Sequence, residues 1–156
     1  MVKLDKIYTR GGDKGLTSLG DGERVKKHSL RINTYGEIDE ANSLLGISII
    51  YSTKETGERL KIIQNDLFDI GGDLCIPDHS KKKKLRVSEE QIEYLEREID
   101  EMNKNLEALS SFVLPGGTKG SAYLHLARCV VRRSERSLTL LADEESIGEI
   151  IAKYEL

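Results

Sequence analysis

The sequence has no tryptophan, and phenylalanine, proline, cysteine and methionine occur only twice each in 156 residues. The low aromatic content fits a helical core built from leucine and isoleucine. The two cysteines, Cys75 and Cys129, lack the spacing of a metal site. We therefore expect both to be reduced thiols in the core of a cytoplasmic protein.

Long apolar runs and an excess of one charge are missing as well. No run approaches the ~20 residues that a membrane-spanning helix needs, and the N-terminal residues lack the apolar segment of a signal peptide. Charged residues make up 33% of the chain, but the formal net charge is only −3. We expect neither a membrane nor nucleic acid as a partner, so any affinity for phosphate must be local.

The length is that of one domain, residues 1–156, with an irregular, glycine-rich segment 1–34 and a helical part 35–156. Apolar residues at helical spacing predict helices over residues 36–51, from 54 to before Pro77, from 88 onward and over 119–142, and a short helical segment over 144–156. Ser88 and Gln91 form a capping-box pattern. We see no strand and no repeat, which predicts an all-α, up-and-down helix bundle.

The most unusual stretch is residues 9–18, which read TRGGDKGLTS. Glycines allow positive φ and the close approach of another group. Successive N–H groups flanked by Arg10, Lys14 and hydroxyls form a cradle for anionic oxygens. This pattern indicates a polyphosphate site, and with it a nucleotide.

The helix predicted over residues 119–142 carries a polar stripe on an otherwise largely apolar surface. Six polar residues share this face because of their helical spacing: Ser121, His125, Arg128, Arg132, Glu135 and Thr139. The stripe either faces solvent or lines a site, and arginine suits bidentate recognition of phosphate and buried ion pairs. Asp39 would be costly to bury unpaired, so we expect it to meet an arginine of this helix, as a structural pair or as part of a site.

Three sequence blocks carry a family resemblance. They are YTRGGDKG at residues 8–15, YGEIDEANS at 35–43, and FVLPGG at 112–117 continuing through HLAR to RRSER at 132–136. In this order and spacing the chain resembles the PduO-type ATP:cob(I)alamin adenosyltransferases over almost its whole length. The resemblance implies a five-helix bundle, ferritin-like in shape, that forms homotrimers with ATP at the subunit interface.

The same resemblance implies transfer of the 5′-deoxyadenosyl group of ATP to the cobalt of cob(I)alamin, with Mg²⁺ assisting and triphosphate as the second product. It matches the nucleotide-binding residues to Thr9, Arg10, Gly11, Gly12, Thr17, Ser18, Lys27, Arg132, Arg133, Ser134, Glu135 and Arg136. It matches Asp39 and Arg128 to an intersubunit ion pair on the cobalamin side. Phe112 matches the aromatic residue that displaces the lower axial ligand, and no residue is matched to a metal ligand.

These residue types suit the reaction. Cob(I)alamin is itself a strong nucleophile, so the protein needs none. Arginines, a lysine, backbone N–H groups and Mg²⁺ can stabilise the charge that develops on the leaving triphosphate, and we expect Arg132 to be among these groups. The implied partners also include a cob(II)alamin reductase and a B12-dependent acceptor enzyme.

Family members usually continue with a last helix of the type Tyr-Leu-Asn-Arg-Leu-Ser-Asp, whereas this chain ends at residues 152–156. We therefore keep open a non-catalytic nucleotide- or cobalamin-binding module that is inactive through truncation. A metal–carboxylate bundle needs Glu-x-x-His pairs. It is disfavoured because no glutamate stands three residues before His28, His79 or His125.

Overall fold

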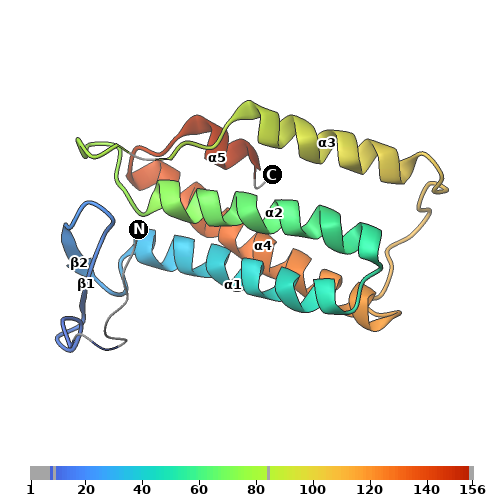
Figure 1. Ribbon diagram of the computed structural model, residues 1–156, viewed down its shortest axis with the longest axis horizontal. Coiled ribbons are helices and arrows are strands. Elements are labelled where there is room, and N and C mark those ends of the chain that lie inside the picture. Colours follow the sequence, from blue (N-terminus) through green and yellow to red (C-terminus); the bar gives the residue numbers. More distant parts are fainter. Residues whose placement is uncertain (1–7, 9, 84, 155–156) are drawn as a thin grey trace.

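The computed structural model describes residues 8, 10–83 and 85–154, which form a bundle of helices with a small hairpin at one end (Figure 1). The elements, in order, are β1 (Leu16–Ser18), β2 (Arg24–Lys26), α1 (Leu30–Ile50), α2 (Lys54–Leu74), α3 (Glu89–Asn103), α4 (Lys119–Glu144) and α5 (Glu149–Tyr154). The chain is thus mostly helical, as predicted, with four long helices and the short α5 in its described part.

Helix starts follow local capping signals. Thr53 and Thr118 each accept a hydrogen bond from a backbone N–H of the first turn, of Thr56 in α2 and of Ser121 in α4, at 3.2 Å. The predicted capping box before α3 is confirmed, since the N–H of Ser88 donates to Gln91 Oε1 at 2.9 Å.

Helix α1 begins at Leu30 rather than at Gly36 as expected. Its added first turns bury Arg31 and Thr34, and the hydroxyl of Thr34 donates to the carbonyl oxygens of Leu30 (2.9 Å) and of Ser137 in α4 (3.3 Å). This packing outweighs the cost of ~1 kcal/mol for a glycine inside a helix.

The expectation of no strand is wrong. β1 and β2 pair antiparallel, with Leu16 opposite Lys26, Thr17 opposite Val25 and Ser18 opposite Arg24. Three-residue strands are too short to show an alternating pattern, so their pairing depends on contacts that the sequence does not display.

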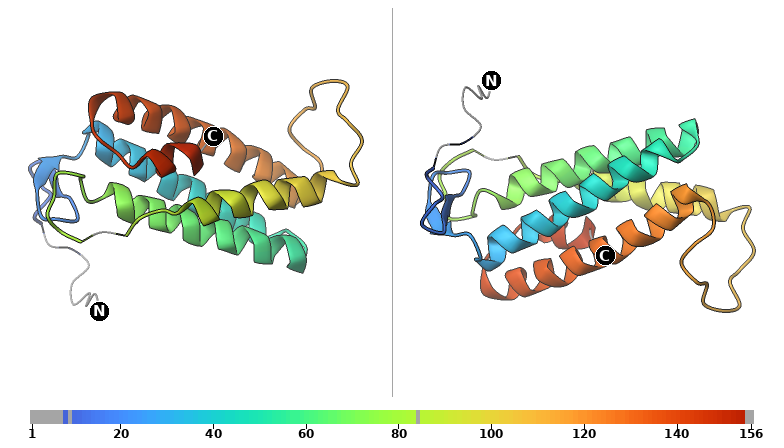
Figure 2. Two further views of the ribbon diagram at one scale, coloured as in Figure 1. Left: turned by 90° about the horizontal axis from the view of Figure 1, so that it is seen from above. Right: turned by 90° about the horizontal axis from the view of Figure 1, so that it is seen from below.

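The core lies between α1, α2 and α4, which run side by side in both views (Figures 1 and 2). Its most deeply buried apolar residues are Ile38, Ala41, Ile70, Leu74, Leu138, Leu141 and Ile151. The apolar residues whose helical spacing predicted α1 and α2 therefore face the core. On α3, only the first half of the apolar face does so: Ile92 and Leu95 pack against the core, whereas Ile99 and Met102 are about half exposed.

A buried carboxylate attaches α3 and α5 to α2. Asp66 of α2 accepts hydrogen bonds from Gln91 Nε2 of α3 (2.7 Å) and from the hydroxyl of Tyr154 of α5 (2.9 Å). A second buried polar residue, Arg31 of α1, donates to the carbonyl of Leu74 and pairs with Glu145 just after α4. These polar contacts hold the start of α1, the start of α3 and the end of α5 in place, in addition to the packing of the apolar core.

Both cysteines are free thiols, but only Cys75 is partly buried. Cys129 is exposed, so the expectation of two core thiols is wrong for it, because the buried positions of α4 next to it, Ala127 and Val130, lie on another side of the helix. Among the described residues, no helix combines the length and apolar character needed to cross a membrane.

We predict that Leu138→Ala lowers the free energy of unfolding by about 2–5 kcal/mol, because it opens a cavity in the core. Leu140→Ala, the same change two positions along α4 at a side chain that is 50% exposed, is the matched control and should cost less than half as much. Urea unfolding followed by circular dichroism measures both. Equal losses would contradict the described packing of α4.

Candidate active site

The glycine-rich segment forms a compact loop that leads into β1. Arg10 has φ +59° and Gly15 has φ +77°. The N–H of Gly15 donates to the carbonyl of Gly12 (3.1 Å), and the N–H of Lys27 donates to the carbonyl of Gly15 (2.9 Å). A non-glycine residue in the left-handed region costs roughly 1–2 kcal/mol, so the backbone at Arg10 is strained.

Cationic side chains converge on this loop. A Cβ atom at Gly12 would lie 2.8 Å from Lys27 Nζ, so the ammonium group lies directly against the backbone of the loop. Arg24 donates hydrogen bonds to the carbonyl of Gly11 and to Ser18 Oγ. The structure therefore brings together five of the predicted nucleotide-binding residues: Arg10, Gly11, Gly12, Ser18 and Lys27.

The two predicted threonines of this segment have different outcomes. Thr17 lies half-buried in β1, opposite Val25. Thr9 lies outside the described residues. Sequence analysis did not assign Arg24 to the site. Its position close to Lys26 and Lys27, which form a basic cluster with it, was a usable signal.

On α4, the predicted nucleotide-binding residues differ in how accessible they are. Arg132 is exposed, and its guanidinium lies 3.6 Å from the carboxylate of Glu135. Arg136 is exposed and donates to the carbonyl of Arg132 (2.7 Å). Ser134 is fully buried, and its hydroxyl donates to the carbonyl of Val131 (2.8 Å), so it faces the bundle rather than solvent.

Arg133 is engaged with α1. Its guanidinium bonds the carboxylate of Glu40 and lies 3.8 Å from that of Glu37. The hydrogen bond to Glu40 raises the pKa of Arg133 above its usual range. Within one chain, therefore, Arg133 joins two helices, whereas Arg132 and Arg136 point outward.

Asp39 does not meet an arginine of α4 in this structure, contrary to the expectation from burial cost. It is exposed on α1 and lines a cavity of about 400 Å³ with Tyr35, Phe68 and Gly72. Glu37 and Glu40 take the arginine instead, because positions three apart share one helix face and position 39 lies on another.

Arg128 lines a different cavity, of about 570 Å³, at the end of the bundle that carries the loop between α3 and α4. Its walls include Tyr51, Ser52, Thr118 and His125. The ring of Tyr51 stacks on that of Tyr123, with centroids 5.5 Å apart. Sequence reasoning missed the residues of the α1–α2 turn, since nothing local marks them as neighbours of α4.

The loop between α3 and α4, residues 104–118, projects from this end of the bundle, opposite the hairpin (Figure 2). It carries a group of exposed apolar side chains: Leu106, Leu109, Phe112, Val113 and Leu114. The ring of Phe112 is fully exposed. Clustered exposed apolar residues are typical of a surface that binds a ligand or another protein.

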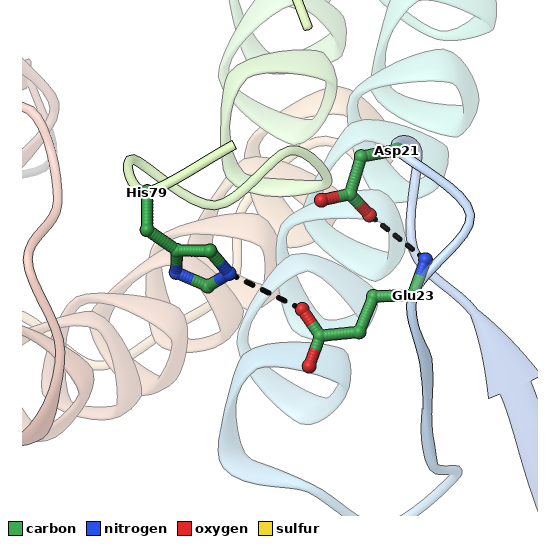
Figure 3. Close-up of side chains that lie close together, drawn as sticks. All are labelled: Asp21, Glu23 and His79. Carbon is green, nitrogen blue, oxygen red and sulfur yellow. Dashed lines mark hydrogen bonds and ion pairs between the residues drawn. The ribbon is translucent and has the colours of Figure 1, made fainter. Parts of the chain in front are cut away.

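One group in the described part of the chain has the donor atoms for a cation: Asp21, Glu23 and His79, whose ligand atoms lie within 4.8 Å of one another (Figure 3). His79 Nε2 lies 3.3 Å from Glu23 Oε2. Asp21 Oδ1 accepts from the N–H of Glu23 (3.0 Å), and this bond lowers the pKa of Asp21. Mg²⁺ prefers an all-oxygen shell, so the imidazole makes this group a poor Mg²⁺ site.

In the described part of the chain, no ion pair connects the glycine loop to the arginines of α4. Both predicted halves of the nucleotide site present exposed cations, Arg10 in the loop and Arg132 and Arg136 on α4.

Comparisons with known proteins identify this arrangement. A family model described as cobalamin adenosyltransferase matches residues 7–154. The chain is 45% identical to a corrinoid adenosyltransferase of Mycobacterium tuberculosis, over 98% of this chain and 82% of the relative. It is 40% identical to one of Bacillus subtilis, over 96% and 78%.

Among solved structures, a variant of the PduO-type ATP:corrinoid adenosyltransferase from Lactobacillus reuteri, complexed with cobalamin and ATP, matches with a TM-score of 0.90. The sequence identity is 33%, and the match covers 96% of this chain and 85% of that one. With a matching helix bundle and a cationic glycine loop at its N-terminal end, the chain belongs to the cobalamin adenosyltransferase family.

Proposed function

We propose that the chain transfers the 5′-deoxyadenosyl group of ATP to the cobalt of cob(I)alamin, giving adenosylcobalamin and triphosphate. The observation that carries this proposal is the cationic glycine loop of residues 10–18 on a fold that matches a relative complexed with both cobalamin and ATP. In this reaction the triphosphate leaves intact, so the loop serves to hold and stabilise a leaving group.

The active assembly we propose is a homotrimeric, ferritin-like five-helix bundle, in which the loop of one subunit faces α4 of its neighbour. Two features of the single chain support it. Among the described residues, no hydrogen bond or ion pair joins the loop to Arg132 or Arg136, and both arginines are exposed. Asp39 and Arg128 line separate cavities, and neither has an ion pair among the described residues, which is compatible with a pair between subunits on the cobalamin side.

In the chemical step, the electron pair of cob(I)alamin attacks C5′ of ATP, a Co–C bond forms, and the C5′–O bond breaks. The bridging oxygen leaves with the triphosphate and carries the developing negative charge. Arg132, Arg136, Lys27 and N–H groups of the glycine loop stabilise that charge, because charged donors act more strongly in the transition state than on ATP itself. Arg10, Thr17, Ser18 and Thr9 complete the wall that orients the nucleotide.

Holding C5′ beside the cobalt supplies much of the remaining rate acceleration. Mg²⁺ enters as part of the Mg–ATP substrate, held chiefly by phosphate oxygens. The Asp21–Glu23–His79 group has no step in this scheme.

The exposed ring of Phe112 has a separate role. We assign it to the lower face of the corrin, where an apolar ring excludes the axial base and so favours reduction of cob(II)alamin to the nucleophilic state. The electron comes from a separate reductase, and a B12-dependent enzyme receives the product.

We predict that the protein converts anaerobic cob(I)alamin and Mg–ATP into adenosylcobalamin, followed by its absorption spectrum. Phosphorus NMR should show triphosphate rather than separate phosphate and diphosphate. A folded protein that binds both substrates, titrated separately, yet gives no product would be a non-catalytic binding module and would refute the proposed function.

We predict that Arg132→Ala lowers kcat by about 10²–10³-fold, the usual effect of losing one donor to a developing anion. Unfolding free energy should change by less than about 0.5 kcal/mol, because the side chain is exposed. Arg97→Ala on α3, which removes an exposed arginine that contacts Tyr94, is the control and should leave kcat unchanged. An unaltered kcat in Arg132→Ala would remove this residue from the mechanism.

We predict that Phe112→Ala slows product formation from cob(II)alamin plus reductant at least tenfold more than from pre-reduced cob(I)alamin. Its ring acts on the reduction step rather than on the transfer. Leu109→Ala in the same exposed loop is the matched control. Equal slowing from both starting states would contradict the proposed role.

A further inference from the structure

We infer that Arg24 is a positioning residue that holds the glycine loop in its nucleotide-binding shape. This inference rests on the proposed function of the loop. Arg24 lies in β2, outside the loop, and its guanidinium bonds two separate points of it. Nη2 donates to the carbonyl oxygen of Gly11 (2.5 Å), and Nη1 donates to Ser18 Oγ (3.0 Å).

The loop needs such a support. Three glycines within five residues give it many alternative backbone conformations, and Arg10 is held at φ +59°. The second half of the loop is fixed by the backbone bonds from Gly15 to Gly12 and from Lys27 to Gly15. In the first half, the N–H of Asp13 reaches the carbonyl of Arg10 only at 3.4 Å. The bond from Arg24 to Gly11 is therefore the main constraint on that half among the described residues.

Arg24 can act as a support because its own strand is anchored to the bundle. The turn between β1 and β2 is joined to the segment after α2 by the N–H of Gly20, which donates to the carbonyl of Cys75 at 2.7 Å. A Cβ atom at Gly20 would lie 2.5 Å from Cys75 Sγ, so the two segments are in close contact.

Two side chains of the segment between α2 and α3, His79 and Lys82, strengthen this attachment. Lys82 Nζ donates to the carbonyl of Gly20 (2.5 Å), and His79 pairs with Glu23, as Figure 3 shows. The constraint thus runs from the end of α2, through the hairpin, to Arg24 and then to Gly11.

Two substitutions of Arg24 distinguish a positioning role from direct electrostatic attraction of the triphosphate. A guanidinium can bond two oxygens at fixed angles, whereas a lysine ammonium at the end of a flexible chain is a point charge. If Arg24 acts by bonding Gly11 and Ser18 together, Arg24→Lys should be nearly as damaging as Arg24→Met. If it attracts the triphosphate by charge, lysine should preserve its function.

The test measures steady-state kinetics of Arg24→Lys and Arg24→Met. We expect both to raise KM for ATP by about tenfold, because the two hydrogen bonds that hold the shape of the loop are lost. The values of kcat and of KM for cob(I)alamin should change by less than about twofold. Lys26→Met, which removes a neighbouring exposed cation of β2, is the matched control and should change none of these.

A second measurement does not depend on activity. In the nucleotide-free protein, ¹⁵N relaxation should show order parameters for Gly11 and Gly12 falling from about 0.85 toward 0.6 in Arg24→Lys, with the helices unchanged. In a double-mutant cycle, Ser18→Ala should raise KM for ATP less in the Arg24→Lys background than in the wild type, because the two side chains share one bond.

The inference is overturned if Arg24→Lys retains the wild-type KM for ATP, or if Gly11 and Gly12 stay rigid in that variant. It is also overturned if kcat falls while KM is unaffected, which would indicate direct contact with the reacting groups. Failure of the wild type to turn over would refute the proposed function instead, while the relaxation measurement would still decide the role of Arg24.

Discussion

The close packing of α1 against α4 is the constraint on which the rest of the structure depends. Small residues at this contact, Thr34 and Ala41 on α1 and Ala127 and Ser134 on α4, are all almost fully buried, which lets the two backbones approach closely. The buried residues Val130, Ser134 and Leu138 set which face of α4 meets the core, and the ion pair of Arg133 with Glu37 and Glu40 is compatible with that rotation. With that rotation set, helical geometry turns Arg132 and Arg136 outward. The half-exposed Arg133, which pairs with α1, and the exposed Arg132 and Arg136 are thus two results of a single packing arrangement.

The hairpin transfers rigidity from the bundle to the part of the chain with the least intrinsic order. A glycine-rich loop binds a polyphosphate well only if its N–H groups are already arranged, because ordering it on binding would cost affinity. Here the end of α2 contacts the hairpin turn through Gly20 and Cys75. The hairpin in turn presents Lys27 and Arg24 to the loop, so each level is held by the one before it.

The described part of the chain has a cationic surface at one end of the bundle and an apolar surface at the other. The cationic loop lies at the hairpin end, whereas the exposed apolar loop with Phe112 and the cavity of Arg128 lie at the other (Figure 2). A reaction between a nucleotide and a corrin needs the cationic surface and the apolar surface close enough together for C5′ of ATP to reach the cobalt. The subunit interface that we propose brings a loop of one chain to α4 of the next, which explains why neither half is closed in a single chain.

Local patterns in the sequence determined most of the helices, the cap of α3 and the nature of the glycine loop. Apolar spacing placed α2 and α4, Ser88 and Gln91 marked the start of α3, and the resemblance led to the correct family. Tertiary structure decided what depends on contacts between distant residues. It extended α1 back to Leu30 and paired two three-residue strands. It also paired Arg133 with Glu37 and Glu40, whereas the sequence had led us to expect Asp39 as the partner of an arginine of α4. Finally, it placed Arg24 between Gly11 and Ser18. The spacing of apolar residues can be recognised within one helix or one strand. The partner of a side chain depends instead on how whole helices rotate and pack against one another, and all of their contacts together determine that packing.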